Sequence, residues 1–321
     1  LPHFWFRNFW KHNPRFEKPE ITALTDGCLQ SHSSRNGHYY LYHESAEQLF
    51  CDNETNNIRM YGRPNDTAYV KDGINNHVVN EIDSVNPEKH GTKAAVWYKK
   101  KLGAGKVVRF RVRLTKIAHE NPWIDFDAIL AARKAETDAF YGELTSPGMT
   151  AGQQHLLRGA FSGLLWTKQF YYLDVYKWLF GEPGDPAPQR LYKRNHDWQH
   201  LTSRNIISMP DKWEYPWFAA WDLAFHAASF VHIDAAFAKQ QLQLVLREYY
   251  MHPNGQIPAY EWNFSDVNPP VHAWSVWYVF EADKKKTGRP DWDFLERAFQ
   301  KLLMNFTWWV NRKDVMGRHV F

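Results

Sequence analysis

Cysteine is scarce in this chain, which has only Cys28 and Cys51 among its 321 residues. One possible pair cannot form the disulfide framework that holds small secreted domains together, and the spacing matches no zinc motif. We therefore expect two free thiols in or near a hydrophobic core. The histidines are scattered rather than placed at ligand spacing, so we predict no metal site and no cofactor.

Long apolar runs are absent too, since no stretch approaches the roughly 18 residues needed to cross a bilayer. The formal net charge is only +4, and basic residues are mixed with acidic residues along most of the chain. We therefore expect neither a membrane nor a nucleic-acid partner. The chain begins at Leu1 and stops at Phe321 directly after a helical pattern. We expect truncation at both ends and leave compartment and oligomeric state open.

Several catalytic motifs are missing. The sequence contains no G-x-S-x-G nucleophile elbow, no H-E-x-x-H zinc motif, no phosphate-binding G-x-x-x-x-G-K and no dinucleotide-binding G-x-G-x-x-G. These absences argue against α/β-hydrolase, zinc-protease, nucleotide-hydrolysing and dinucleotide-dependent functions.

Residues 1–118 have the pattern of a β-sandwich domain. Residues 36–43 are rich in strand formers, and residues 106–114 alternate between apolar and basic side chains. We expect 106–114 to form a hairpin with residues 92–101. Residues 51–81 are dense in Asn, Asp and Gly and are predicted to form long loops.

The rest of the chain has helical patterns. Residues 119–150 are predicted to contain a linker helix, and residues 151–321 to form an all-α domain. The expected helices of that domain cover residues 152–180, 217–232, 234–250, 271–287 and 291–311, with Asp234 as an N-cap and an irregular segment over 189–216. Short loops alternate with a long polar and aromatic loop, which is typical of a toroid of helical hairpins. The long loops would then surround the site.

Aromatic residues are abundant, at 17% of the chain, and six of them lie in KWEYPWFAAWDLAFH (212–226). Because proline is common at the first helical position, Pro216 predicts a helix start there, with Asp222 in the second turn. Apolar neighbours would favour the protonated form of the Asp222 carboxyl, which a general acid requires. The alternative is a structural carboxylate that pairs with His226 or Lys212.

Rings and polar groups near Asp222 suit a ligand with apolar faces and hydroxyl edges, as sugars have. The candidate substrate contacts are Trp213, Trp217, Phe218, Trp221, Arg194, Trp198, Glu261, Asp266 and Trp274. Glu261 and Asp266 could equally be turn or surface residues, and Arg194 and Trp198 could merely stabilise a loop.

Residues 207–226, together with 238–274 and FTWWVNRKD (306–314), resemble the catalytic region of glycoside hydrolase family 63, the mannosyl-oligosaccharide glucosidases. The similarity is greatest to bacterial glucosidase-type members and extends into the β region. It implies a β-sandwich followed by an (α/α)6 barrel, of which residues 151–321 would supply the first half.

The resemblance also implies inverting, exo-acting hydrolysis of α-glucosides or oligosaccharides. The general acid of the family is the Asp of an aromatic-W-D motif, and this role falls on Asp222. The general base is a Glu near the end of the barrel, which would lie outside these residues, so this chain alone is expected to be inactive.

Two other functions stay open on the residues alone. A non-catalytic carbohydrate-binding protein could use the same rings, with Asp222 as a hydroxyl acceptor. The chain could also be another helical-toroid enzyme, such as a polysaccharide lyase or a terpene-type cyclase. The cyclase is disfavoured because no D-D-x-x-D metal motif occurs.

Overall fold

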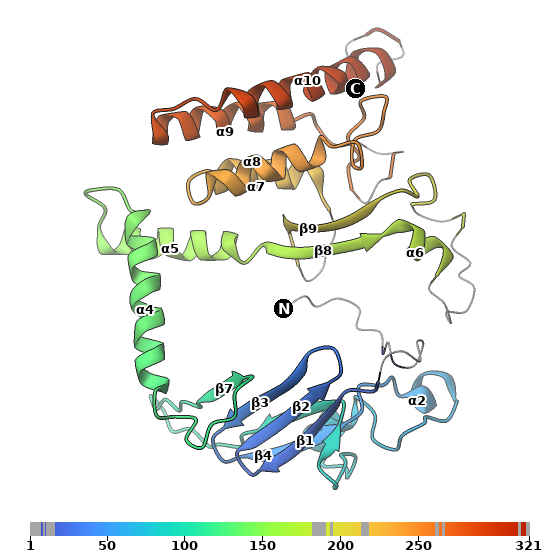
Figure 1. Ribbon diagram of the computed structural model, residues 1–321, viewed down its shortest axis with the longest axis vertical. Coiled ribbons are helices and arrows are strands. Elements are labelled where there is room, and N and C mark those ends of the chain that lie inside the picture. Colours follow the sequence, from blue (N-terminus) through green and yellow to red (C-terminus); the bar gives the residue numbers. More distant parts are fainter. Residues whose placement is uncertain are drawn as a thin grey trace. The chain divides into compact units, whose positions relative to one another are not determined.

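The computed structural model describes residues 8, 10, 17–181, 191–192, 195–212, 218–260, 263–264, 267–313 and 316–318. The chain divides into two compact units between residues 134 and 135. The first unit is rich in antiparallel strands and the second is mainly helical (Figure 1). This order of a β-rich and a helical region is the one that the sequence predicts.

The first unit contains two antiparallel sheets, which are consistent with a β-sandwich. The larger sheet has the strand order β5-β1-β2-β3-β7, and the smaller pairs β4 with β6. The strands are β1 (Glu20–Thr25), β2 (Cys28–Ser33), β3 (Gly37–His43), β4 (Glu47–Cys51), β5 (His90–Gly91), β6 (Lys93–Trp97) and β7 (Val112–Thr115). Cys28 and Cys51 are buried and free, as predicted.

The predicted hairpin of the β region is wrong. Strand β6 pairs with β4, and β7 is short and pairs with β3. Side-chain contacts rather than a strand ladder hold the residues before β7. The Phe110 ring lies 4.0 Å from that of Tyr98, and Arg111 Nε lies 2.7 Å from a Glu44 carboxylate oxygen. An alternating pattern of apolar and polar residues indicates a strand but does not show which other strand it pairs with.

The Asn-rich segment 51–81 contains two helices rather than loops alone. These are α2 (Asn57–Tyr61) and α3 (Gly73–Asn80). The side chain of Asn56 accepts a hydrogen bond from Arg59 N and so caps the start of α2. Asparagine favours both turns and helix N-caps, so its density does not distinguish the two.

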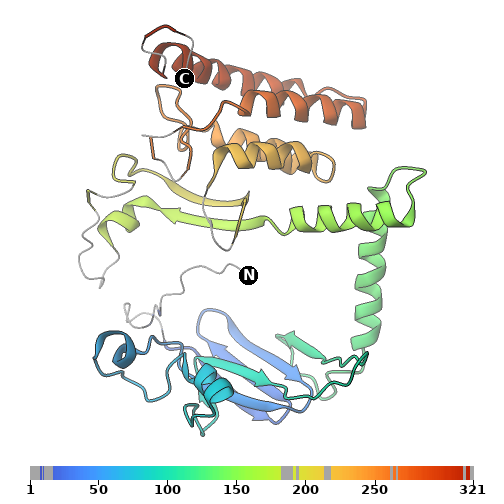
Figure 2. The same cartoon turned by 180° about the vertical axis from the view of Figure 1, so that it is seen from behind.

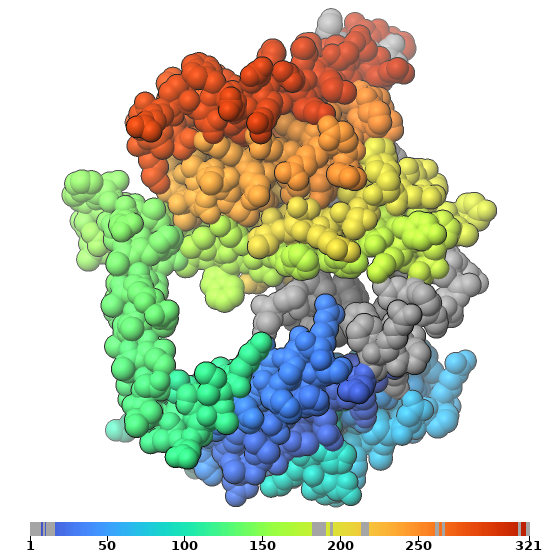
Figure 3. Space-filling view, viewed as in Figure 1, coloured from blue at the N-terminus to red at the C-terminus, as the bar shows by residue number. Residues whose placement is uncertain are grey.

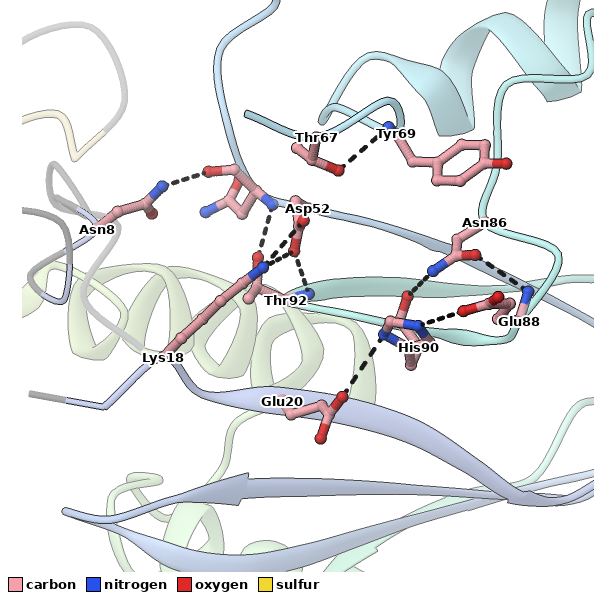
Figure 4. Close-up of polar contacts among 11 residues, drawn as sticks. Asn8, Lys18, Glu20, Asp52, Thr67, Tyr69, Asn86, Glu88, His90 and Thr92 are labelled. Carbon is pink, nitrogen blue, oxygen red and sulfur yellow. Dashed lines mark hydrogen bonds and ion pairs between the residues drawn. The ribbon is translucent and has the colours of Figure 1, made fainter. Parts of the chain in front are cut away.

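Side-chain hydrogen bonds join the ends of β4, β5 and β6 (Figure 4). The buried Asp52 accepts from Thr92 N at 3.2 Å and lies 3.0 Å from Lys18 Nζ. Asn86 donates to the His90 carbonyl at 2.8 Å. These bonds satisfy polar groups where the regular strand pairing stops.

The second unit combines helices with one strand pair, and α4 runs across the boundary between the units. Its elements are α4 (Phe126–Glu143), α5 (Ala151–Leu165), β8 (Lys168–Asp174), α6 (Val175–Phe180), β9 (Thr202–Ser208), α7 (Ala220–Phe230), α8 (Ala235–Val245), α9 (His272–Thr287), α10 (Trp292–Trp308) and a π-helical turn η1 (Trp309–Lys313). In the described part of the chain, no helix combines the length and the hydropathy needed to span a bilayer.

The long helix expected over 152–180 is wrong, because α5 ends at Leu165 and strand β8 follows. Strand β8 pairs with β9, which lies in the segment expected to be irregular. The aromatic run in β8 alternates as a strand does: Tyr171 is buried while Phe170 and Tyr172 are exposed. Side-chain burial therefore alternates with a period of two residues in a segment that was predicted to be helical.

Helices α7 to α10 share one hydrophobic core, with Phe230, Leu242, Val279 and Phe294 among its buried residues. They form two helical hairpins that stack on each other (Figures 1 and 3). Asp234 caps α8 as predicted, accepting from Phe237 N at 2.9 Å. The closed toroid stays a prediction.

Candidate active site

The two hairpins place three helix ends together. Four residues join α7 to α8, and four join α9 to α10, whereas residues 246–271 connect α8 to α9. The first turns of α7 and α9 and the last turn of α10 consequently meet on the side of this long connection (Figure 2). The expected pattern of short loops at one end and a long loop at the other is present in these helices.

The long connection is tied to the helix ends by hydrogen bonds. Ala219 forms a β-bridge with Tyr260, and Ala220 N donates to Ala259 O at 3.3 Å. This gives a partner to one of the N–H groups that a helix start leaves unpaired. On the other side, Asn305 of α10 donates from Nδ2 to Gly255 O at 2.8 Å.

A pocket lies between these helix ends. Three indole rings line it, from Trp221, Trp308 and Trp309, beside the amides of Asn268 and Asn305. The Nδ2 groups of both amides donate to main-chain carbonyls, and among the described residues no donor is found for either Oδ1. Rings for an apolar face and amide oxygens for hydroxyls are a combination that suits a sugar.

His272 also lines the pocket, at the first residue of α9. Its Nε2 lies 2.9 Å from Leu242 O, and because a carbonyl only accepts, Nε2 carries the proton. Burial lowers the pKa of His272 to about 4. The ring is therefore neutral near pH 7, and its Nδ1 carries a lone pair.

Asp222 lies in the first turn of α7 and not in the second, because the helix starts at Ala220. It is partly exposed, and it lies next to Trp221 without lining the pocket itself. Among the described residues, none donates a hydrogen bond to its carboxylate or forms an ion pair with it. The structural pairing weighed for Asp222 is thus not seen in the described part of the chain.

The two candidate partners of Asp222 have other contacts. Lys212 Nζ lies over the Trp166 ring, 4.9 Å from its centroid. His226 Nδ1 lies 2.5 Å from Ser208 Oγ at the end of β9. Burial lowers the pKa of His226, and the charge of Asp222 opposes this effect. Asp222 and His226 therefore interact through charge, without a direct hydrogen bond.

The structure separates the predicted ring contacts into two kinds. Trp221 is 38% exposed and Trp274 is 50% exposed, and Phe225 lies between them with ring centroids 5.9 and 5.8 Å away. Phe218 is only 3% exposed, and Trp198 only 5%. Exposed rings can contact a ligand, whereas the buried pair supports the fold.

The two buried rings have identifiable packing partners. Phe218 stacks on Tyr250 at a centroid distance of 5.2 Å. Trp198 donates from Nε1 to Tyr249 O at 2.5 Å, and its ring packs against Phe264. Trp213, Trp217, Arg194, Glu261 and Asp266 lie outside the described residues.

Sequence reasoning missed Trp308, Asn268 and Asn305 as pocket residues. Asn305 stands in the apolar run KLLMNFTWW, and a polar residue in such a run is a sign that it has a buried partner. Within the residues that the structure describes, no group of three or more His, Cys, Asp or Glu side chains could hold a metal ion.

The helical region matches a glycoside hydrolase family. Residues 215–321 match the model of the mannosylglycerate hydrolase MGH1-like glycoside hydrolase domain. The match includes Asp222, helices α7 to α10 and the pocket described above. It supports the expected resemblance at the level of a glycoside hydrolase domain.

A curated relative extends the similarity over most of the chain. The chain is 48% identical over 292 residues to Uncharacterized protein YMR196W of Saccharomyces cerevisiae, an alignment that covers 85% of this chain and 27% of the yeast protein. The chain thus spans about a quarter of the length of this relative.

Proposed function

We propose that this chain is part of an inverting, exo-acting glycoside hydrolase of the α-glucosidase type, with Asp222 as its general acid. The match of residues 215–321 to a glycoside hydrolase domain carries this proposal. The position of Asp222 at a helix end, beside a pocket lined by indole rings and amides, supports it.

In the proposed reaction, the carboxylic acid of Asp222 gives its proton to the glycosidic oxygen while the bond from that oxygen to the anomeric carbon breaks. Water attacks the anomeric carbon from the opposite face and loses a proton to a general base. That base is a Glu outside residues 1–321, with its carboxyl roughly 6.5–9.5 Å from that of Asp222 so that the water fits between them.

Substrate recognition follows from the groups at the helix ends. Trp221 would stack on an apolar sugar face, and the amide oxygens of Asn268 and Asn305 would accept from hydroxyls. Trp274 would extend the apolar surface along α9. The predicted contacts Trp213, Trp217, Arg194, Glu261 and Asp266 belong to the same proposal.

The architecture that completes the site is also proposed. Residues 1–118 form a β-sandwich, residues 119–150 a linker helix, and residues 151–321 the first half of an (α/α)6 barrel. The remaining helices and the general base would come from other parts of a longer protein. A relative of which this chain covers 27% is compatible with that arrangement.

One observation favours a second function, the binding of carbohydrate without catalysis. A carboxylate in the first turn of a helix is stabilised by the positive end of the helix dipole, and Asp222 is in that position. An ionised Asp222 would accept hydrogen bonds from sugar hydroxyls and would donate no proton.

The deciding experiment supplies α-linked gluco- and manno-disaccharides to the full-length protein and follows the anomer of the product by NMR. We expect hydrolysis with inversion, so the first product signal from an α-glucoside is the β anomer. Retention of the anomer would refute the inverting mechanism. Saturable binding without hydrolysis of any disaccharide would favour the carbohydrate-binding protein.

A further inference from the structure

The pocket between the helix ends has a buried floor and an exposed rim. Its floor is formed by residues that are only 6–7% exposed, namely Ala220, His272, Asn305 and Trp308. Trp221 also lines the pocket and is far more exposed. A group of a ligand that passes the Trp221 ring therefore reaches polar side chains that belong to the core.

The space inside the pocket is small. The cavity measures about 30 Å³, which gives room for about two water-sized groups. A pyranose ring with its hydroxyl groups is several times larger. A whole sugar residue consequently does not fit into the cavity, whereas a single substituent of a sugar ring does.

His272 brings a hydrogen-bond acceptor to this cavity. Its Nε2 carries the proton, because Nε2 lies 2.9 Å from the Leu242 carbonyl oxygen, which can only accept. The bond ties one side of the ring to α8, while the residue lines the pocket. Nδ1 is left with a lone pair, and none of the described residues donates to it.

Asn305 brings a second acceptor. Its Nδ2 donates to Gly255 O, which fixes the amide so that Oδ1 is the free acceptor among the described residues. In the same part of the chain, the fully buried side-chain atoms without a partner belong to other residues, Trp10, Gln48 and Asn195. His272 Nδ1 and Asn305 Oδ1 are therefore accessible, although both residues are buried.

A group that enters this cavity has to be small, and it has to donate a hydrogen bond. A group without a donor would displace water and leave buried acceptors unpaired, which is costly. The hydroxymethyl group of a hexose meets both requirements, since it consists of one carbon and one hydroxyl. It also carries its hydroxyl further from the ring than the other hydroxyls, which are attached to the ring directly.

We propose that the cavity is a subsite for the hydroxymethyl group of a hexose, with His272 Nδ1 and Asn305 Oδ1 as the acceptors for its hydroxyl. This inference rests on the proposed function, because it takes the site to bind carbohydrate. The sugar ring lies outside the cavity, against Trp221. His272 and Asn305 thus determine specificity: they select hexoses over pentoses, which lack this group.

The test measures the binding of free sugars to the full-length protein by isothermal titration, since a hydrolase does not consume them. The hexose is D-glucose or D-mannose, whichever binds better. It is compared with its own analogue in which fluorine replaces the hydroxyl of the hydroxymethyl group. It is also compared with the pentose of the same configuration, D-xylose for glucose or D-lyxose for mannose.

We expect the fluoro analogue and the pentose to bind roughly ten- to a hundredfold more weakly than the hexose. Fluorine occupies nearly the same space as the hydroxyl but cannot donate to His272 or Asn305. The pentose places nothing in the cavity. The two comparisons therefore separate the loss of the hydrogen bond from the loss of the whole group.

A variant that fills the cavity gives a second measurement. Ala220→Val adds bulk at a buried residue of the cavity floor, so the hexose should lose its advantage while the pentose binds as in the wild type. Ala228→Val is the matched control, because Ala228 is a buried alanine of the same helix that does not line the pocket. The control should keep the preference for the hexose.

The outcomes distinguish this inference from the proposed function. Equal affinities for the hexose, its fluoro analogue and the pentose would overturn the subsite, with water as the occupant of the cavity. Absence of saturable binding by all of these sugars would overturn it as well. Hydrolysis with equal affinities would refute the subsite alone. Selective binding of the hexose without hydrolysis of any disaccharide would support the subsite and refute the hydrolase function.

Discussion

Gly255 and Asn305 join the long connection to α10. Asn305 Nδ2 donates to Gly255 O at 2.8 Å, and Gly255 has a positive φ of 96°. A Cβ added to Gly255 would overlap the carbonyl oxygen of Met304. The connection between α8 and α9 thus approaches α10 too closely to leave room for a Cβ, and it does so beside the pocket residue Asn305.

Gly255→Ala is expected to destabilise the protein, because alanine has a Cβ where none fits and disfavours a positive φ. Gly288→Ala is the matched control, with a φ of 70° and open space around the position. We expect about 1–2 kcal/mol of lost stability for the control and clearly more for Gly255→Ala. Urea unfolding of both variants measures the difference, and equal losses would contradict the close approach.

Asp222→Asn keeps the shape of the side chain and removes the proton that a general acid gives. We expect kcat of the full-length enzyme to fall by about 10²–10⁴-fold, with little change in sugar affinity. Asp293→Asn is the matched control, since Asp293 lies in the first turn of α10 and is exposed. Steady-state kinetics with a hydrolysed disaccharide provides the measurement. Similar activity in both variants would remove Asp222 from the mechanism.

Trp221→Ala is expected to weaken carbohydrate binding, because the indole is the exposed ring of α7 that also lines the pocket. The loss should be roughly two- to tenfold in Kd, because aromatic contacts contribute about 0.5–1.5 kcal/mol. Trp292→Ala, at the start of α10, is the control for losing an exposed tryptophan away from the pocket. Isothermal titration of both variants tests whether the effect is specific.

His272 is expected to make the stability of the protein depend on pH. Its pKa is about 4 in the folded protein, below the ordinary 6.5, so the unfolded chain binds the proton more tightly. Stability should therefore rise with pH between about 4 and 6.5 and fall as the solution is acidified through that window. The contribution of this one residue is roughly 3 kcal/mol across the window.

His272→Gln tests this dependence, since the Gln amide can still donate to Leu242 O and has no proton to titrate there. The free energy of unfolding, measured from pH 7 to pH 4, should have a smaller slope in the variant than in the wild type. Parallel curves would show that His272 does not carry the pH dependence.

Much of the helical unit could be predicted from local patterns. Helices α8, α9 and α10 lie within the predicted ranges, and Asp234 caps α8, because helical periodicity and capping depend on residues close in sequence. The strand pair β8 and β9 escaped prediction because a strand is stabilised by a partner that can lie far along the chain. For the same reason, the prediction that the β6 and β7 segments pair with each other was wrong, since β6 pairs with β4 and β7 with β3.

The candidate site was predictable in part. The aromatic segment around Asp222 was visible in the sequence, and Trp221 and Trp274, two of the contacts predicted there, are exposed. Whether a ring faces solvent or the core depends on what packs against it, and so the burial of Phe218 and Trp198 could not be inferred.

The sequence by itself determined that the chain has a β-rich region and then a helical region, and that Asp222 lies in a segment rich in aromatic residues. Those features depend on composition and on short-range periodicity. Only the tertiary structure decided that Trp308 meets Trp221 at a pocket and that Ser208 holds His226 one turn from Asp222. These contacts join segments far apart in the chain, and they form because the helix and strand faces can bury their apolar side chains only against one another.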